Sequence, residues 1–291
     1  MPLTVAVLCS QTQDFLRRYF FSVNRPKVSF AIDGIRYVGQ NVAILALINW
    51  FPANGASALW LVSAVAAVGS LAALPCIPQL KYSFSAFLSV SLHGWHFSKW
   101  LFASTLVVAA FNNLFYFASG ILLGVGAVGA MKAAFTMVSI ANVVIEACVN
   151  VIPASASRKF MSNGRRGLIA YLLKVTIYGT VAIVSLLGVV VIAPKFWLHF
   201  FFGPQFSSYW TLVQWYAAYE ILLFLAMVVG TWYRTLERTR LIFYAVSFSV
   251  IVSITVAYPL IVNFGVAGAV VGLALGQLAQ TLFMLVYAAW R

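Results

Sequence analysis

Six polar residues recur at helical spacing within one apolar segment of the chain, residues 128–152. A helix advances about 100° per residue, so their side chains gather within about 120° of its circumference. They are Lys132, Thr136, Ser139, Asn142, Glu146 and Asn150. Ionised side chains are costly inside an apolar span, and there they mark a functional site. This polar stripe therefore predicts a helix with one side that faces something other than hydrocarbon, and it is a candidate functional site.

Each member of the stripe also has a structural interpretation. Thr136, Ser139 and Asn142 belong to residue types that hydrogen-bond across membrane helices and stabilise their packing. Lys132 lies within about a turn of the start of the span, from where its long side chain can extend to the membrane surface. Glu146 lies about two turns from the other end, too deep for a short side chain to reach water. We therefore expect Glu146 in a water-filled cavity or paired with a basic residue.

Two further ionisable residues fall inside apolar segments. Glu220 lies near the middle of residues 209–232, and Lys174 lies about two turns from the inner end of residues 168–193. Together with four members of the stripe they form the predicted lining of a substrate cavity: Lys132, Asn142, Glu146, Asn150, Lys174 and Glu220.

The sequence contains no arrangement typical of an enzyme. Its five acidic residues are dispersed, and no glycine run follows a strand as a phosphate-binding loop would. His93 and His96 lie close together, but a third metal ligand is missing. The three cysteines, Cys9, Cys76 and Cys148, are too scattered for a metal cluster and odd in number, so they predict no disulfide framework. We therefore expect a protein without catalytic activity, metal or other cofactor.

The composition places the chain in a membrane. Of its 291 residues, 63% are hydrophobic and 8% are charged, whereas soluble domains carry about 25% charged residues. A net charge of +13 would suggest nucleic-acid binding in a soluble protein. Here the basic residues lie in short loops beside apolar spans, where topology and anionic lipid headgroups account for them. We expect membrane lipids as partners and no nucleic acid.

Apolar spans of about 20 residues can cross a bilayer. The sequence predicts an all-α polytopic membrane protein with about eight transmembrane helices, and the first ten residues predict the stub of another. The spans are residues 31–50, 55–75, 99–119, 128–152, 168–193, 209–232, 241–262 and 265–289. Within the first of them, Asp33 and Arg36 are three residues apart and are expected to pair on one helix face.

Two segments mix aromatic and basic residues, as helices on a membrane surface do. The first is Gln11–Ser29 and the second is residues 81–98. We interpret the second as an amphipathic linker between an N-terminal helical lobe, residues 1–80, and a C-terminal six-helix lobe, residues 99–291.

The distribution of basic residues predicts the orientation, because cytoplasmic loops collect Lys and Arg. If the segment before the first span is cytoplasmic, all but two of the 18 Lys and Arg residues fall on or near that side. The exceptions are Lys132 and Lys195. An even number of spans then places the C-terminus in the cytoplasm as well. We therefore expect a multi-pass protein of the cytoplasmic membrane.

Several short motifs resemble, in sequence and in order, the bacterial polysaccharide-export flippases of the multidrug, oligosaccharidyl-lipid and polysaccharide exporter superfamily. They are Gln11–Pro26, Asp33–Tyr37, Phe97–Trp100, the glycine-rich residues 120–129, Gly129–Ala134 and Asn150–Arg158. The resemblance implies two bundles of six helices around a central cavity that opens alternately to either side. With about eight spans, this chain is expected to represent that architecture only in part and to lack the four N-terminal helices.

The same resemblance implies a function. It is the translocation of a lipid-linked oligosaccharide, a polyprenyl-pyrophosphate glycan, across the cytoplasmic membrane for surface polysaccharide synthesis. Lys132 and Lys174 would bind the pyrophosphate, and a polysaccharide polymerase or other assembly proteins would be partners. Three alternatives remain open: a cation-coupled exporter of small molecules from the same superfamily, a membrane enzyme of polysaccharide assembly, and a fragment without activity.

Overall fold

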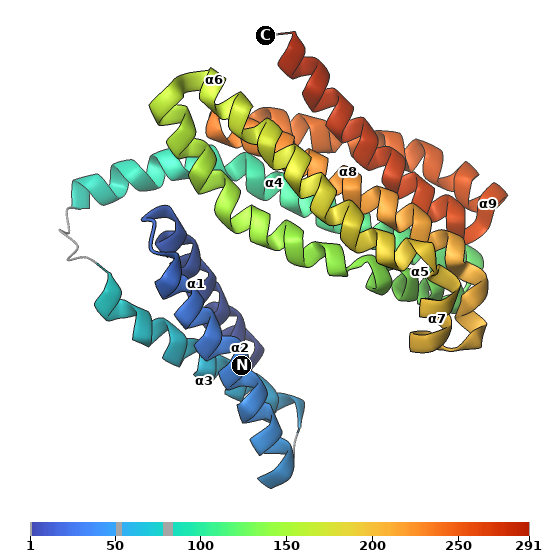
Figure 1. Ribbon diagram of the computed structural model, residues 1–291, viewed down its shortest axis with the longest axis horizontal. Helices are drawn as coiled ribbons and strands as arrows, with labels where there is room; N and C mark the ends of the chain where they lie inside the picture. The colour runs from blue at the N-terminus through green and yellow to red at the C-terminus, as the bar shows by residue number, and fades with distance from the viewer. Residues whose placement is uncertain (1, 51–53, 78–83, 291) are drawn as a thin grey trace. The chain divides into compact units, whose positions relative to one another are not determined.

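The computed structural model describes residues 2–50, 54–77 and 84–290. Nearly all of these residues lie in helices, and none of them lies in a strand. The chain divides into two compact units, Met1–Phe84 and Ser85–Arg291, which we call unit 1 and unit 2. Figure 1 shows the helices of both units.

The described residues of unit 1 form three helices and one short 3-10 turn. They are α1 (Pro2–Ser22), α2 (Pro26–Trp50), α3 (Gly55–Ala73) and η1 (Leu74–Cys76). The Asn54 side chain accepts a hydrogen bond from the Ser57 backbone, and the Ser57 hydroxyl accepts one from the Asn54 backbone. This reciprocal cap satisfies backbone donors that would otherwise lack partners at the start of α3.

The N-terminal helix differs from its prediction. The expected stub and most of the expected surface segment Gln11–Ser29 form one continuous helix, α1. Its apolar face, with Leu16 and Phe20 buried, packs against Ile32 of α2 and Ala73 of α3. The amphipathic pattern is therefore explained by helix packing within unit 1, which buries the same face that a membrane surface would.

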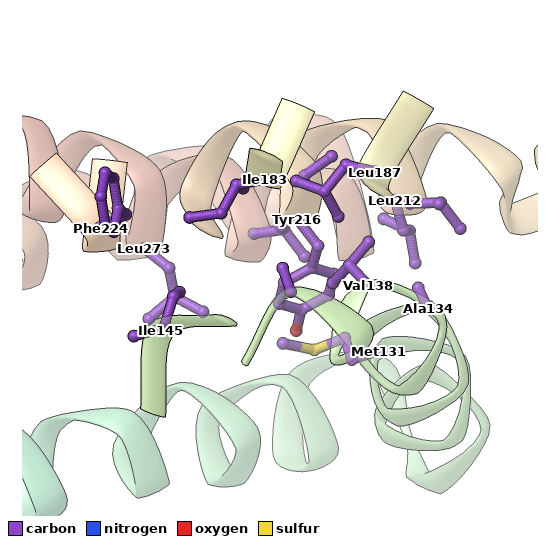
Figure 2. Packing of buried hydrophobic residues seen from close by; sticks show 14 of the residues in the cluster. Met131, Ala134, Val138, Ile145, Ile183, Leu187, Leu212, Tyr216, Phe224 and Leu273 are labelled. Atoms are coloured by element: carbon purple, nitrogen blue, oxygen red, sulfur yellow. The ribbon is translucent and has the colours of Figure 1, made fainter. Parts of the chain in front are cut away.

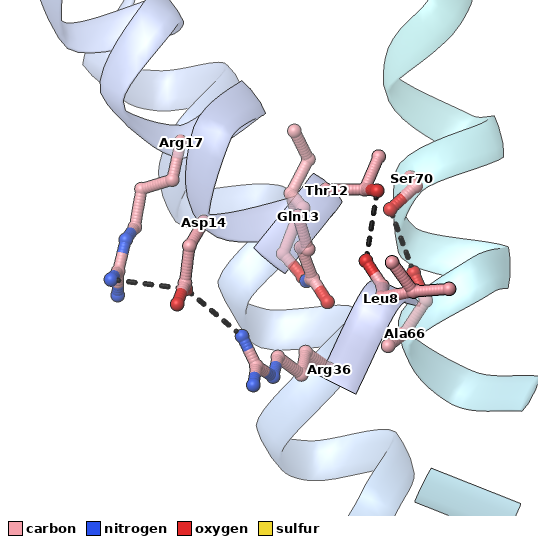
Figure 3. Close-up of polar contacts among 9 residues, drawn as sticks. Leu8, Thr12, Gln13, Asp14, Arg17, Arg36, Ala66 and Ser70 are labelled. Carbon is pink, nitrogen blue, oxygen red and sulfur yellow. Dashed lines mark hydrogen bonds and ion pairs between the residues drawn. The ribbon is translucent and has the colours of Figure 1, made fainter. Parts of the chain in front are cut away.

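The charged residues of unit 1 also pair differently from the prediction. Asp14 of α1 forms ion pairs with Arg17, at 3.2 Å, and with Arg36 of α2, at 3.1 Å (Figure 3). The expected pair between Asp33 and Arg36 is therefore wrong, because α1 supplies a closer carboxylate. One carboxylate oxygen of Asp33 is buried without a hydrogen-bond partner among the described residues.

Unit 2 contains longer helices, several of them joined by very short turns. They are α4 (Phe84–Leu123), α5 (Val125–Val138), α6 (Ile140–Ile192), α7 (Pro194–Phe202), η2 (Pro204–Tyr209), α8 (Trp210–Thr235) and α9 (Thr239–Ala289). The predicted linker is not a separate element: its residues 84–98 are the first part of α4, and residues 81–83 lie outside the described residues.

Helices α6 and α9 are each a hairpin of two arms, as Figure 1 shows. The chain reverses at Gly164 (φ 61°) and at Gly265 (φ 59°), backbone conformations that glycine adopts without steric cost. In α9 the Ser249 hydroxyl donates to the Gly276 carbonyl at 2.8 Å. A Cβ atom at Gly268 would overlap the Leu260 carbonyl. The two arms of α9 therefore approach each other closely at these glycines.

Five helices of the described residues are long and apolar enough to cross a membrane. They lie within Gly55–Cys76, Phe87–Leu123, Ile140–Ile192, Pro204–Thr235 and Thr239–Ala288. The predicted class, an all-α membrane protein, agrees with this finding. The predicted number of eight spans is not established by it, because two of the five are hairpins and α2 is not among them.

The core of unit 2 surrounds α8, the most buried of these helices. Met131 and Val138 of α5 and Ile183 of α6 pack around Tyr216 and Phe224 of α8 (Figure 2). The second arm of α6 approaches α8 closely at Gly179, where a Cβ atom would overlap the Phe224 ring. The central helix is therefore α8, and α5 and the first arm of α6 form part of the wall around it.

Candidate functional site

A cavity of about 620 Å³ lies within unit 2, between α4, α5, α6, α8 and α9. Helix α8 lines it with one complete face, which includes Tyr216, Glu220, Leu223, Met227, Gly230 and Arg234. Steps of three and four residues keep these positions on the same side of a helix. From Tyr216 to Arg234 a helix rises by about 27 Å, and the hydrocarbon core of a bilayer is about 30 Å thick. The cavity therefore extends over nearly the depth of a membrane.

The polar stripe of α5 and α6 faces this cavity only in part. Lys132, Phe135 and Asn142 line it, followed by the apolar residues Ile145 and Val149. Asn142, Ile145 and Val149 are three and four residues apart on α6, which is one face of a helix. That face lies beside the centre of the stripe, so only the asparagine and the long lysine side chain reach the cavity.

The remaining members of the stripe have other surroundings. Glu146 is exposed on α6, and the Asn150 amide donates to the backbone carbonyl of Glu146 at 2.9 Å. The hydroxyl groups of Thr136 and Ser139 donate to the carbonyls of Lys132 and Thr136, at 2.8 and 2.7 Å. Ser139 also separates α5 from α6, so the stripe is not carried by one straight helix.

One end of the cavity combines a cation with aromatic rings. The Lys132 ammonium lies 4.0 Å from the centroid of the Tyr116 ring of α4, within the range of cation–π attraction. The rings of Phe135 and Tyr216 meet edge to face, with centroids 5.6 Å apart. Lys132 takes part in none of the ion pairs found among the described residues. Its charge is therefore available to an anion in the cavity.

Glu220 lies farther along the same face of α8. Its side chain is 0% exposed, and neither carboxylate oxygen has a hydrogen-bond partner in the described part of the chain. The polar side chain of Asn142 lies beside the Glu220 carboxyl group, but the two groups do not form a hydrogen bond of good geometry. A buried carboxyl group is costly unless a cation or a proton compensates its charge. Glu220 can therefore take up either from the cavity.

The opposite end of the cavity holds a second cation, Arg234, in the last turn of α8. Gln277 and Gln280 of α9 line the cavity between the two ends, and Asn113 of α4 lines it as well. Sequence reasoning did not identify Arg234 as a cavity residue, because its charge was explained by topology alone. The steps of three and four residues from Tyr216 through Glu220 to Arg234 would have revealed it.

The structure brings together three of the six predicted site residues. Lys132, Asn142 and Glu220 line the cavity, whereas Glu146 and Asn150 do not. Lys174 is exposed on the second arm of α6 and is likewise outside the lining.

Comparisons of the chain with protein-family models, with characterised proteins and with solved structures found no match. Within residues 2–50, 54–77 and 84–290, no three His, Cys, Asp or Glu side chains are placed to hold a metal ion.

Proposed function

We propose that this protein translocates a lipid-linked oligosaccharide across the cytoplasmic membrane for surface polysaccharide synthesis. The observation that carries the proposal is a cavity about 27 Å long with Lys132 at one end and Arg234 at the other. A guanidinium or an ammonium group binds phosphate oxygens well. The amides of Asn142, Gln277 and Gln280 supply donors and acceptors for sugar hydroxyl groups.

The proposed orientation in the membrane determines which of the two cations the substrate meets first. Eight spans result if α2, α3, α4 and α8 each cross once, α5 continues into the first arm of α6, and the remaining arms of α6 and α9 cross separately. The C-terminus then lies in the cytoplasm, Arg234 at the inner mouth and Lys132 at the outer mouth. A pyrophosphate meets Arg234 first and Lys132 last, while its lipid tail remains in the bilayer.

The driving force in this proposal is electrical. A membrane potential that is negative inside favours outward passage of an anion by about 2.3 kcal/mol per charge per 100 mV. Two cations at the ends of the path lower the cost of bringing the pyrophosphate through an apolar region. Polysaccharide-assembly proteins that supply or consume the glycan are the partners that this function requires.

A second candidate function is favoured by Glu220. A buried carboxyl group that faces a cavity is the device that a cation-coupled exporter of small molecules needs. The same superfamily contains such exporters, so the sequence resemblance fits either function. The two differ in their cargo and in how strictly they depend on the Glu220 carboxyl group.

The proposal is tested by filling the cavity from a position that has room. A Cβ atom at Gly230 would meet nothing within 4 Å, and Gly230 lines the cavity. Gly188 on α6 has the same open space but does not line it. The full chain is reconstituted in liposomes, and movement of a fluorescent polyprenyl-pyrophosphate oligosaccharide is measured for Gly230→Trp and Gly188→Trp.

We expect Gly230→Trp to slow translocation by about tenfold or more, because the indole occupies the path, which corresponds to at least about 1.4 kcal/mol. Gly188→Trp should retain a rate within about twofold of the unaltered chain. Equal rates for the two variants, or no movement of the glycan by the unaltered chain, would contradict the proposed function.

A further inference from the structure

A second hollow, of about 510 Å³, lies on the other face of α8, between this helix, the second arm of α6 and the end of α9. We call it the apolar groove. Its three walls include Leu173 of α6, Leu225 of α8 and Leu285 of α9. The two hydroxyl groups in its lining, those of Thr176 and Thr281, donate to carbonyls of their own helices at 2.9 and 2.8 Å. The groove therefore suits a hydrocarbon chain.

A basic turn lies at one end of this groove. Arg158, Lys159, Arg165 and Arg166 surround the reversal of α6 at Gly164, and all four are exposed. No acidic residue lies between residues 147 and 219. The four side chains form none of the ion pairs found among the described residues. The turn is therefore a site of uncompensated positive charge.

The second arm of α6 connects the turn to the groove. Ile169, Leu172 and Thr176 line the groove and follow Arg165 by four, seven and eleven residues. These spacings place them within about 40° of Arg165 around the helix. Arg165 therefore lies one helical turn beyond the groove on the same face, and Arg166 lies next to it. Lys174 lies about 180° away, on the opposite side of the arm.

We propose that this region binds an anionic phospholipid of the leaflet at the basic end of unit 2. Arg165 and Arg166 hold the phosphate, and one acyl chain fills the apolar groove. Charge complementarity selects the head group, because cations beside a groove in a membrane meet the phosphates of the lipids around them. The site is separate from the cavity, since the two use opposite faces of α8.

The test uses the purified full chain in detergent and native mass spectrometry. The chain is titrated with phosphatidylglycerol and with phosphatidylcholine that carry identical acyl chains. Arg165→Gln with Arg166→Gln removes the head-group contacts, and Leu285→Trp fills the groove. Lys174→Gln is the matched control, because it removes an exposed cation from the same arm but from the opposite face. Circular dichroism verifies that each variant keeps its helical content, and Ala288→Leu replaces Leu285→Trp if the latter does not.

We expect the unaltered chain to retain one phosphatidylglycerol more tightly than phosphatidylcholine. The double arginine variant should weaken phosphatidylglycerol by about fivefold per cation removed. It should weaken phosphatidylcholine less, because the choline ammonium group already compensates the phosphate charge of that lipid. Filling the groove should weaken both lipids, and Lys174→Gln should change neither by more than about twofold. The proposal is overturned if Lys174→Gln weakens phosphatidylglycerol as much as the arginine variant does, or if both lipids bind the groove-filled chain as before.

Discussion

The cavity and the apolar groove lie on opposite faces of α8 and have similar volumes, about 620 and 510 Å³. Their chemistry differs. The cavity receives Glu220 and Arg234 from α8, whereas the groove receives Leu225, Val228 and Trp232. The centres of the two sets of positions are about 170° apart around the helix. One helix thus separates a polar path from an apolar surface. The positions of polar and apolar residues along α8 indicate which side faces the cavity and which faces the groove.

This difference teaches how to interpret ionisable residues in the spans of this protein. Glu220 and Glu146 are both acidic and both lie inside predicted spans, yet one is buried beside the cavity and the other is exposed on α6. Depth along a span therefore does not identify a functional carboxylate here. The face of the helix does.

The largest expected effect comes from placing a charge on the wrong face. Leu223 lines the cavity and Leu225 lines the groove, two residues farther along α8. We expect Leu225→Asp to destabilise the inserted protein by about 3 kcal/mol, the cost of an aspartate that faces hydrocarbon. Leu223→Asp should cost less than half as much, because its carboxylate faces the cavity. The yield of monodisperse protein and its thermal unfolding in lipid nanodiscs measure the difference, and equal losses would contradict the division.

A smaller effect is expected from replacing glutamate by glutamine, which keeps the shape of the side chain but removes its carboxyl group. For the cation-coupled exporter, Glu220→Gln should lower transport by about tenfold, or about 1.4 kcal/mol, because an amide takes up neither a cation nor a proton. Glu146→Gln should leave the rate within about twofold, because Glu146 lies outside the lining. Transport by the reconstituted chain provides the measurement. A larger loss for Glu146→Gln than for Glu220→Gln would restore the interpretation that the sequence favoured.

Composition and hydrophobic length were sufficient to predict a helical membrane protein. The reversal before Gly265 could also be predicted, since Asn263, Phe264 and this glycine interrupt an apolar run. The packing of α1 against α2 and α3 could not be predicted. Its amphipathic face fits a membrane surface as well as it fits Ile32 and Ala73, and only the tertiary contacts decide between them.

The candidate site was predictable only where the helix pattern stayed regular. Lys132 and Asn142 were found from their spacing. The spacing also included Glu146, because the side of α6 that lines the cavity is marked by the apolar residues Ile145 and Val149, which the polar pattern does not count. Arg234 was missed because a basic residue at a helix end has a sufficient explanation in topology. The pairing of Arg36 with Asp14 instead of Asp33 depends on the neighbouring helix, which the local sequence does not encode.

The division of α8 into a wet face and a lipid-facing one is tested most directly by cysteine accessibility. Cys9, Cys76 and Cys148 are first replaced by alanine, and single cysteines are then introduced at Met227, in the cavity, and at Val229, in the groove. A charged methanethiosulfonate reagent reacts with the thiolate, which requires water. We predict rapid modification of Met227→Cys in native membranes and protection of Val229→Cys. Protection of both positions, or faster modification at residue 229, would contradict a water-filled path along α8.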